Sequence, residues 1–228
     1  MNRIAYLIIS FVLLAVGCTN SDRTNKSLVE IDSLLDKGLV DSAYSRLQVL
    51  SLDDMPTADD SAYYYMLNTQ AEFRQYKPIS STKHIDYSIN VFSKTNSDNE
   101  KLASAYYYKS MISYELGKVK DCVINLKKAD FIAKSSNNLV LKHKIYDGFV
   151  MVNEKAGDNR VALDYLKKSM EVSKQANRLN WLAHAYSNMA AVYSRLGMND
   201  SLEICLKKSM ELVKNMPEKD NPYILINI

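Results

Sequence analysis

The side chains that could do chemistry in this 228-residue chain do not form a catalytic or metal-binding pattern. No HExxH, CxxC or paired-histidine spacing includes its three histidines, His84, His143 and His184. The sequence also lacks a GxSxG motif, a P-loop and a GxGxxG motif, and its carboxylates are scattered as on exposed helix faces. We therefore predict no enzyme activity, no metal and no cofactor, and we expect the histidines to be solvated helix residues.

The three cysteines have two different expected roles. Cys122 and Cys205 lie 83 residues apart, each within an apolar helical pattern. A disulfide between them is possible in an oxidising compartment, but the pattern favours two buried free thiols. Cys18 instead ends an apolar run near the N-terminus, so its role depends on that run.

The N-terminal segment has the properties of a secretory signal. Arg3 precedes an apolar run over residues 4–17, and these 14 residues are too few for a membrane span of about 20. The end of the run, "LAVGC", resembles the lipobox of bacterial lipoproteins, in which a small residue precedes the cysteine that is lipidated. Gly17 and Cys18 match that pattern, whereas Ala15 stands where leucine is commonest, with Leu14 one place earlier.

This resemblance implies a signal peptide over residues 1–17, lipidation of Cys18, and a polar tether over residues 18–26. The mature chain would then be anchored by its lipid in the bacterial cell envelope, facing the periplasm or on the outer membrane. An ordinary signal peptide and a short uncleaved anchor are the alternatives.

The composition excludes further classes of protein. Six glycines and four prolines are few, which argues against an all-β fold with many tight turns and against disorder. The 29 basic and 26 acidic residues are interspersed, and a net charge of +3 is too balanced for a nucleic-acid binder. We expect no direct binding of nucleic acid by this segment.

An internal repeat of 40 residues organises the rest of the chain. The tetrapeptides LKKA, LKKS and LKKS keep this spacing at 126–129, 166–169 and 206–209. The same spacing relates three glycines and three tyrosines, which are Gly117, Gly157, Gly197, Tyr106, Tyr146 and Tyr186. Apolar residues at helical spacing on both sides of each glycine predict two helices joined by a glycine in the left-handed conformation. Because neither helix could bury its apolar face alone, we predict an all-α, helical-hairpin repeat solenoid.

Two earlier units are less regular. Residues 38–47 keep the glycine, alanine and leucine intervals of residues 157–166. The motif "SAYYY" occurs at Ser61–Tyr65 and at Ser104–Tyr108, a spacing of 43 that aligns Tyr63 with Tyr106. The turn of this irregular unit has Arg74–Pro78 in place of a glycine.

These units resemble the tetratricopeptide repeat (TPR) family, in a form longer than its usual unit of about 34 residues. The aromatic of the family's first helix corresponds to Tyr63, Tyr106, Tyr146 and Tyr186. Small residues of the pattern are matched by Ser110 and Ala190, whereas Val150 and Leu202 depart from it. The resemblance implies a TPR-like right-handed superhelix over residues 27–228, with about five units of which the last is incomplete.

In this family the first helix of each unit lines a concave groove that binds a protein or peptide. The resemblance implies a groove formed by Tyr64, Asn68, Ala71, Tyr107, Met111, Tyr114, Asp147, Met151, Glu154, Ser187, Ala191 and Ser194. This mixture suits an extended peptide or a helix. Within each "SAYYY" motif we expect the first tyrosine in the core, the second in the groove, and the third against a neighbouring unit.

The lysine pairs at 127–128, 167–168 and 207–208 would form a basic stripe along the outer helices. Such a stripe could meet anionic lipid or an acidic partner. Nearby carboxylates weaken any positive field, so we favour a solvated face whose lysine stems cover apolar surface.

The expected function is therefore a non-catalytic, lipid-anchored TPR scaffold that binds a protein or peptide, with no small-molecule substrate. The alternative is the N-terminal sensory domain of a membrane-bound helix-turn-helix transcription regulator whose C-terminal part is absent here. This alternative arises because residues 218–228 resemble the start of another first helix.

Overall fold

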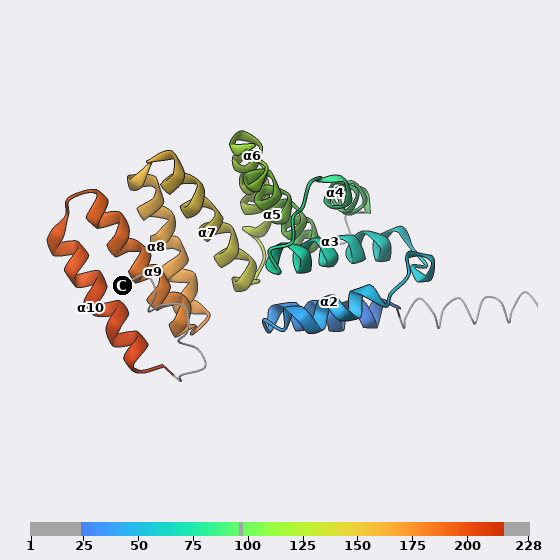
Figure 1. Ribbon diagram of the computed structural model, residues 1–228, viewed down its shortest axis with the longest axis horizontal. Helices are drawn as coiled ribbons and strands as arrows, with labels where there is room; N and C mark the ends of the chain where they lie inside the picture. Colours follow the sequence, from blue (N-terminus) through green and yellow to red (C-terminus); the bar gives the residue numbers. More distant parts are fainter. Residues whose placement is uncertain (1–23, 96–97, 217–228) are drawn as a thin grey trace, which may run out of the picture. The chain divides into compact units, whose positions relative to one another are not determined.

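The computed structural model describes residues 24–95 and 98–216, and every regular element in these ranges is a helix (Figure 1). The predicted signal peptide, Cys18 and the incomplete last unit lie outside the described residues. The first helix spans residues 24–36, so it includes residues 24–26 of the predicted tether. The helices divide into two compact units, the first ending at Leu116 and the second beginning at Gly117.

The first unit consists of hairpins built from helices of unequal length. After helix 24–36 come α2 (Val40–Gln48), the short 3₁₀ helix η1 (Leu52–Asp54), α3 (Ala58–Arg74), α4 (Lys83–Thr95) and α5 (Asn99–Glu115). Thr57 and Asp98 cap α3 and α5 by accepting hydrogen bonds from backbone N–H groups of their first turns.

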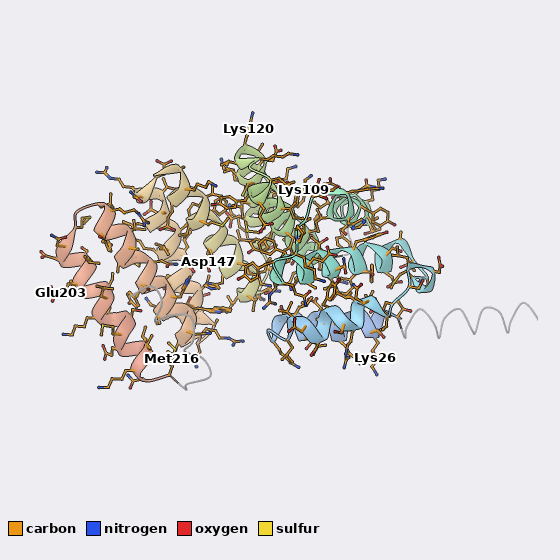
Figure 2. The ribbon with its side chains drawn as sticks, in the orientation of Figure 1. Lys26, Lys109, Lys120, Asp147, Glu203 and Met216 are labelled. Carbon is orange, nitrogen blue, oxygen red and sulfur yellow. The ribbon has the colours of Figure 1, made fainter. Side chains whose placement is uncertain are left out.

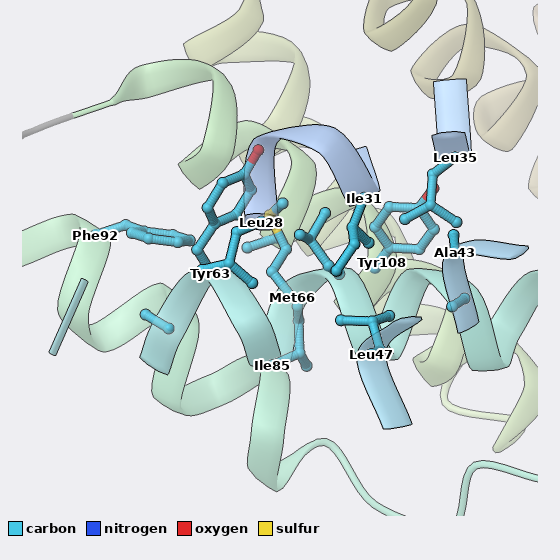
Figure 3. Close-up of a cluster of buried hydrophobic side chains, with 14 of the residues drawn as sticks. Leu28, Ile31, Leu35, Ala43, Leu47, Tyr63, Met66, Ile85, Phe92 and Tyr108 are labelled. Carbon is cyan, nitrogen blue, oxygen red and sulfur yellow. The ribbon is translucent and has the colours of Figure 1, made fainter. Parts of the chain in front are cut away.

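The core of the first unit joins all of its long helices (Figure 3). Leu28, Ile31 and Leu35 lie one turn apart on helix 24–36 and are at most 1% exposed. They belong to one buried cluster with the labelled residues of Figure 3 from α2 to α5, which are Ala43, Leu47, Tyr63, Met66, Ile85, Phe92 and Tyr108. Burial of this shared face holds the short helices in place, because a helix of α2's nine residues is not stable alone.

The second unit follows the 40-residue repeat closely. It consists of α6 (Val119–Ala133), α7 (Leu139–Ala156), α8 (Asn159–Gln175), α9 (Leu179–Arg195) and α10 (Asn199–Lys214). Cys122 and Cys205 are buried in this unit as free thiols, as predicted. The all-α, helical-hairpin prediction is thus confirmed for both units. None of the helices in the described ranges is long and apolar enough to cross a bilayer.

The lysine pairs of the repeat lie on a solvated face, as predicted. All six lysines of the three pairs are exposed. The Lys168 Nζ atom lies 4.6 Å from the centre of the Tyr165 ring, and the Lys208 Nζ atom lies 5.3 Å from that of Tyr186. Their side chains therefore cover aromatic surface of their own hairpins.

The "SAYYY" alignment is wrong by two residues for the α3/α4 hairpin. The Ser88 hydroxyl donates to the carbonyl oxygen of Ala62, as that of Ser209 donates to Ala183, and both pairs are 26 residues apart. In this register Tyr65, three residues after Ala62, takes the place of Tyr186. A shift of two residues turns a side chain by about 200° around the helix, so identical letters face different neighbours.

The tyrosines of the two motifs occupy only some of the positions predicted for them. Tyr63 is buried as expected, but its hydroxyl donates to Asp32 of helix 24–36, 2.5 Å away. Tyr65, predicted to lie against a neighbouring unit, packs its ring on His84 and Tyr87 of α4 in its own hairpin. Tyr108 does meet the preceding hairpin, because its ring lies edge-on to Phe73 of α3.

The turns inside the helical hairpins share one backbone arrangement. Gly38, Gly117, Gly157 and Gly197 have φ values of 82°, 72°, 78° and 69°, as the left-handed prediction requires. At Gly157 the following N–H, of Asp158, donates to the Asn153 carbonyl, which satisfies a carbonyl of the last helical turn. Tyr76 takes the same place after α3 with φ of 54°, and its side chain is 93% exposed.

We predict that Gly157→Ala lowers the free energy of unfolding by about 1 kcal/mol, because a side chain strains the left-handed conformation. An added Cβ at this position meets no atom within 4 Å, so backbone strain is the only cost. Urea denaturation followed by circular dichroism would measure the change.

Tyr76→Gly is the matched reverse substitution, and we expect it to raise the free energy of unfolding by about 0.5–1 kcal/mol. The exposed Tyr76 ring has little packing to lose. Equal effects of the two substitutions would contradict the strain assignment.

Candidate functional site

The predicted groove residues lie on α3, α5, α7 and α9, and they differ in exposure. Ser194 is exposed, whereas Asn68, Met111 and Ser187 are at most 9% exposed and present little surface to a ligand. Six others are partly exposed, namely Tyr64, Tyr107, Tyr114, Asp147, Met151 and Glu154, whereas Ala71 is fully buried and Ala191 is exposed. In the corrected register of α3, Met66, Gln70 and Phe73 take the positions assigned to Tyr64, Asn68 and Ala71.

Side chains of α7 and α9 meet at two places in the second unit. The His143 ring of α7 stacks on the Trp181 ring of α9, with ring centres 4.2 Å apart and an angle of 11° between the planes. Farther along the same helices, Glu154 and Arg195 form an ion pair. The faces that bear these residues therefore line one surface, which we call the α7/α9 face.

The α7/α9 face contains most of the predicted groove residues of this unit. Asp147, Met151 and Glu154 recur at helical spacing on α7, and His184, Asn188 and Ala191 do so on α9 between Trp181 and Arg195. The Arg178 guanidinium lies 5.4 Å from the Trp181 ring centre. The face thus combines aromatic surface, a thioether and charges of both signs.

A cluster of three polar side chains lies beneath this face. His143 and Asp147 are one turn apart on α7, and Ser169 approaches them from α8 (Asp147 is labelled in Figure 2). The Ser169 hydroxyl donates to Asp147 Oδ1 at 2.8 Å, and Ser169 Oγ lies 2.9 Å from His143 Nδ1. His143 Nε2 lies 3.2 Å from Asp147 Oδ2, which closes a ring of three contacts.

Each contact in this ring needs one proton. The hydroxyl proton of Ser169 is donated to Asp147, so His143 Nδ1 must carry a proton to donate to Ser169. A third proton must lie between His143 Nε2 and Asp147 Oδ2, on either atom. The ring is therefore complete when the histidine and carboxyl share one dissociable proton, and loss of that proton leaves one contact without a donor.

Burial favours the uncharged form of both titratable members. Desolvation, with smaller contributions from His184 and Lys144, lowers the pKa of His143 to about 4. Desolvation raises the pKa of Asp147 to about 7, although the hydrogen bond from Ser169 opposes this change. Between these values the carboxyl holds the shared proton and the imidazole is neutral, which agrees with the closed ring.

The repeat itself shows that the fold does not need this cluster. Ser169 corresponds to Ser88 and Ser209, whose hydroxyls donate to the carbonyl oxygens of Ala62 and Ala183. His143 occupies the position of those alanines, which are fully buried small residues. The α7/α8 hairpin therefore has a ring of titratable side chains at the position where the α3/α4 and α9/α10 hairpins pack closely through alanine.

The expectation that the histidines are solvated is wrong for His143. Its exposed fraction is 8%, because Ser169 and Trp181 cover it. His184 is partly buried, and burial lowers its pKa against the opposing effect of Glu154. His84 is exposed on α4 and stacks on Tyr65. The break in the 40-residue alanine pattern at His143 was the signal that could have identified the cluster.

The serine, histidine and aspartate of this cluster are not arranged as a nucleophilic triad. Ser169 is 1% exposed, and its proton is donated to the carboxylate oxygen, so its hydroxyl cannot approach a substrate. Among the described residues, no group of three or more histidine, cysteine or acidic side chains could hold a metal ion. The arrangement can instead fix the position of Trp181 and present Asp147, whose side chain is 34% exposed.

Comparison with known proteins identifies the fold. No family model matches the chain, and no curated protein matches it. BtubC (BKLC) from P. vanneervenii is similar in structure, with a TM-score of 0.63, 15% identity, and coverage of 92% of this chain and 85% of that chain. A putative kinesin light chain from Podosopora anserina with TPR-like repeats has a TM-score of 0.53 at 12% identity, over 84% of this chain and 95% of that chain.

Aspartyl phosphate phosphatase F from Bacillus subtilis is also similar, with a TM-score of 0.64 and 15% identity. The match covers 94% of this chain but 56% of that chain. At these identities the likeness establishes the fold alone, and the chain has a TPR-like helical repeat fold.

We predict that Asp147→Asn makes stability rise with pH, relative to the unsubstituted chain, between about pH 4 and 7. Unfolding restores the pKa of His143 from about 4 to 6.5, so the unfolded chain takes up a proton there and stability rises with pH. The pKa of Asp147 returns from about 7 to 3.8 on unfolding, so the carboxyl releases a proton. The contribution of Asp147 to stability therefore falls as the pH rises. The changes of stability with pH that arise from His143 and from Asp147 oppose each other. Asp147→Asn removes only the change that arises from Asp147.

The expected difference across this range is about 1–3 kcal/mol, since Asp147 is partly exposed. Urea denaturation at a series of pH values would measure it. Asp164→Asn is the control, because the Asp164 side chain is 70% exposed on α8. Parallel pH curves for Asp147→Asn and the unsubstituted chain would contradict the assignment.

Proposed function

We propose that this chain is a non-catalytic scaffold that binds a protein or peptide through the α7/α9 face, anchored in the bacterial cell envelope by a lipid on Cys18. The TPR-like fold supports a role in protein interaction. The observation that carries the choice of face is the replacement of alanine by His143. This replacement adds a buried polar ring and a stacked tryptophan that the hairpin does not need for folding.

The chemistry of the face suits a peptide with both apolar and cationic side chains. Trp181 and Met151 offer apolar surface, while the carboxylate of Glu154, which pairs with Arg195, can also accept a hydrogen bond from a cationic side chain. Trp181 is held by His143 and Arg178, so it loses little conformational freedom when a ligand packs on it. A preformed surface of this kind favours binding without a large rearrangement.

The absence of catalysis is part of the proposal. The serine of the polar ring is buried, and its three members satisfy one another's hydrogen bonds. Transfer of the shared proton to a bound substrate would leave one contact of the ring without a donor, whereas a positioning role uses the ring as it stands.

We predict that Ala191→Arg on the α7/α9 face weakens binding of the partner about tenfold or more. Ala191 is exposed, so the arginine occupies the face without disturbing the core. Val161→Arg is the matched control, because Val161 is 41% exposed on the outer helix α8. Partners would be captured from an envelope extract with each variant, and the dissociation constant of a recovered partner would then be measured.

A partner lost with Ala191→Arg and retained with Val161→Arg would support the proposal. Identical partners and affinities for the two variants would place binding elsewhere on the chain.

The lipid anchor gives a separate prediction. A fatty-acid probe supplied to bacteria that express the full chain should label it, and Cys18→Ala should abolish the label because it removes the acceptor thiol. Cys122→Ala is the control, since that thiol is buried. Label that persists in Cys18→Ala, or no label on the natural chain, would contradict lipidation and favour the membrane-bound regulator.

A further inference from the structure

A cavity in the α3/α4 hairpin is not used by the proposed function. Its volume is about 320 Å³, and it lies in the first unit beside Tyr65. Three segments line it: η1 provides Leu52, α3 provides Ser61 and Tyr65, and α4 provides Lys83, His84 and Tyr87. A cavity of this size is at the lower limit for small-molecule sites.

Aromatic rings in mutual contact form one side of the cavity. The Tyr65 and His84 rings are stacked with centres 4.6 Å apart, and Tyr87 stands edge-on to Tyr65 at 5.5 Å. These contacts hold the rings in place, so a flat ligand would meet a rigid aromatic wall. Leu52 adds an apolar side chain on the segment that joins α2 to α3.

Two other hairpins have a lysine at the position that corresponds to Tyr87. Tyr65 corresponds to Tyr146 and Tyr186, and 22 residues after each of those tyrosines a lysine approaches the ring. The Lys168 and Lys208 Nζ atoms lie 5.8 and 5.3 Å from the ring centres of Tyr146 and Tyr186. In the α3/α4 hairpin the corresponding residue is Tyr87, and the cavity lies beside it. The Tyr87 side of the cavity therefore differs from the corresponding positions of these two hairpins.

The charge of the lining selects the chemistry of a ligand. Lys83 is the one permanently charged lining residue, and the lining includes no aspartate or glutamate. Tyr65 and Tyr87 add hydroxyl groups that can donate hydrogen bonds, whereas the Ser61 hydroxyl already donates to the carbonyl oxygen of Thr57. An anionic group can therefore be bound beside an aromatic wall without facing a carboxylate of the lining.

We propose that this cavity binds a small ligand that combines a flat aromatic ring with a carboxylate group. The ring packs against Tyr65 and Tyr87, and the carboxylate accepts hydrogen bonds from Lys83 and a neighbouring hydroxyl. The ligand is bound and not converted, so the site adds a binding activity to the proposed scaffold without making the chain an enzyme. The site lies in the first unit and is independent of the α7/α9 face.

The test uses the full chain and three probes that separate charge from ring. 4-Hydroxyphenylacetate has both features, its neutral amide has only the ring, and acetate has only the charge. We expect the acid to bind with a dissociation constant of about 1 mM, about tenfold tighter than either other probe. Nuclear magnetic resonance would detect binding as saturable shifts of the Tyr65, His84 and Tyr87 ring signals.

Variants separate the two parts of the site. Lys83→Ala should reduce affinity for the acid about tenfold, to the level of the amide, whereas Lys167→Ala on exposed α8 surface should leave it unchanged. Tyr87→Ala should weaken the acid and the amide alike, because both lose the ring contact. The proposal is overturned by equal binding of acid and amide, by shifts confined to other residues, or by no shift up to about 10 mM.

Discussion

Close packing between the two helices of a hairpin is the constraint on which this structure depends. It requires small residues at the contact, and the second helix supplies Ser88, Ser169 or Ser209 there. Two of these serines donate their hydroxyl to a carbonyl oxygen of the first helix, which satisfies a polar group that the contact has buried. The bond fixes the rotation of one helix against the other, and hence which side chains of each first helix lie outside the contact.

The exception at His143 is informative because the same contact tolerates it. A histidine in place of alanine would leave buried nitrogen atoms without partners unless the surroundings provided them. Ser169 turns its hydroxyl toward side chains of α7, and Asp147 completes a ring in which every contact can hold a proton. The replacement moves the polar bond from the backbone to titratable side chains and stacks Trp181 on the result.

The α3/α4 hairpin departs from the repeat in a different way. Its serine bond to Ala62 is unchanged, so the packing rule is kept. The difference lies beside Tyr65, where Tyr87 takes the position of Lys168 and Lys208 and η1 adds Leu52. Both candidate sites therefore occur where one hairpin departs from the repeat, at the helix contact in one case and beside it in the other. Repetition provides the comparison by which such changes can be recognised within a single chain.

The sequence by itself determined the helices, their pairing and the left-handed glycines, because these follow from local periodicity and from backbone conformation. It also predicted the buried thiols and the solvated lysines from the apolar pattern. The tertiary structure decided which face each residue occupies. Tyr63 is buried as predicted but bonds to helix 24–36, and Tyr65 packs on α4, since helix rotation is set by the Ser88 contact and not by matching letters. His143, Asp147 and Ser169 became one site only because two helices bring together residues that lie 22 and 26 positions apart along the chain.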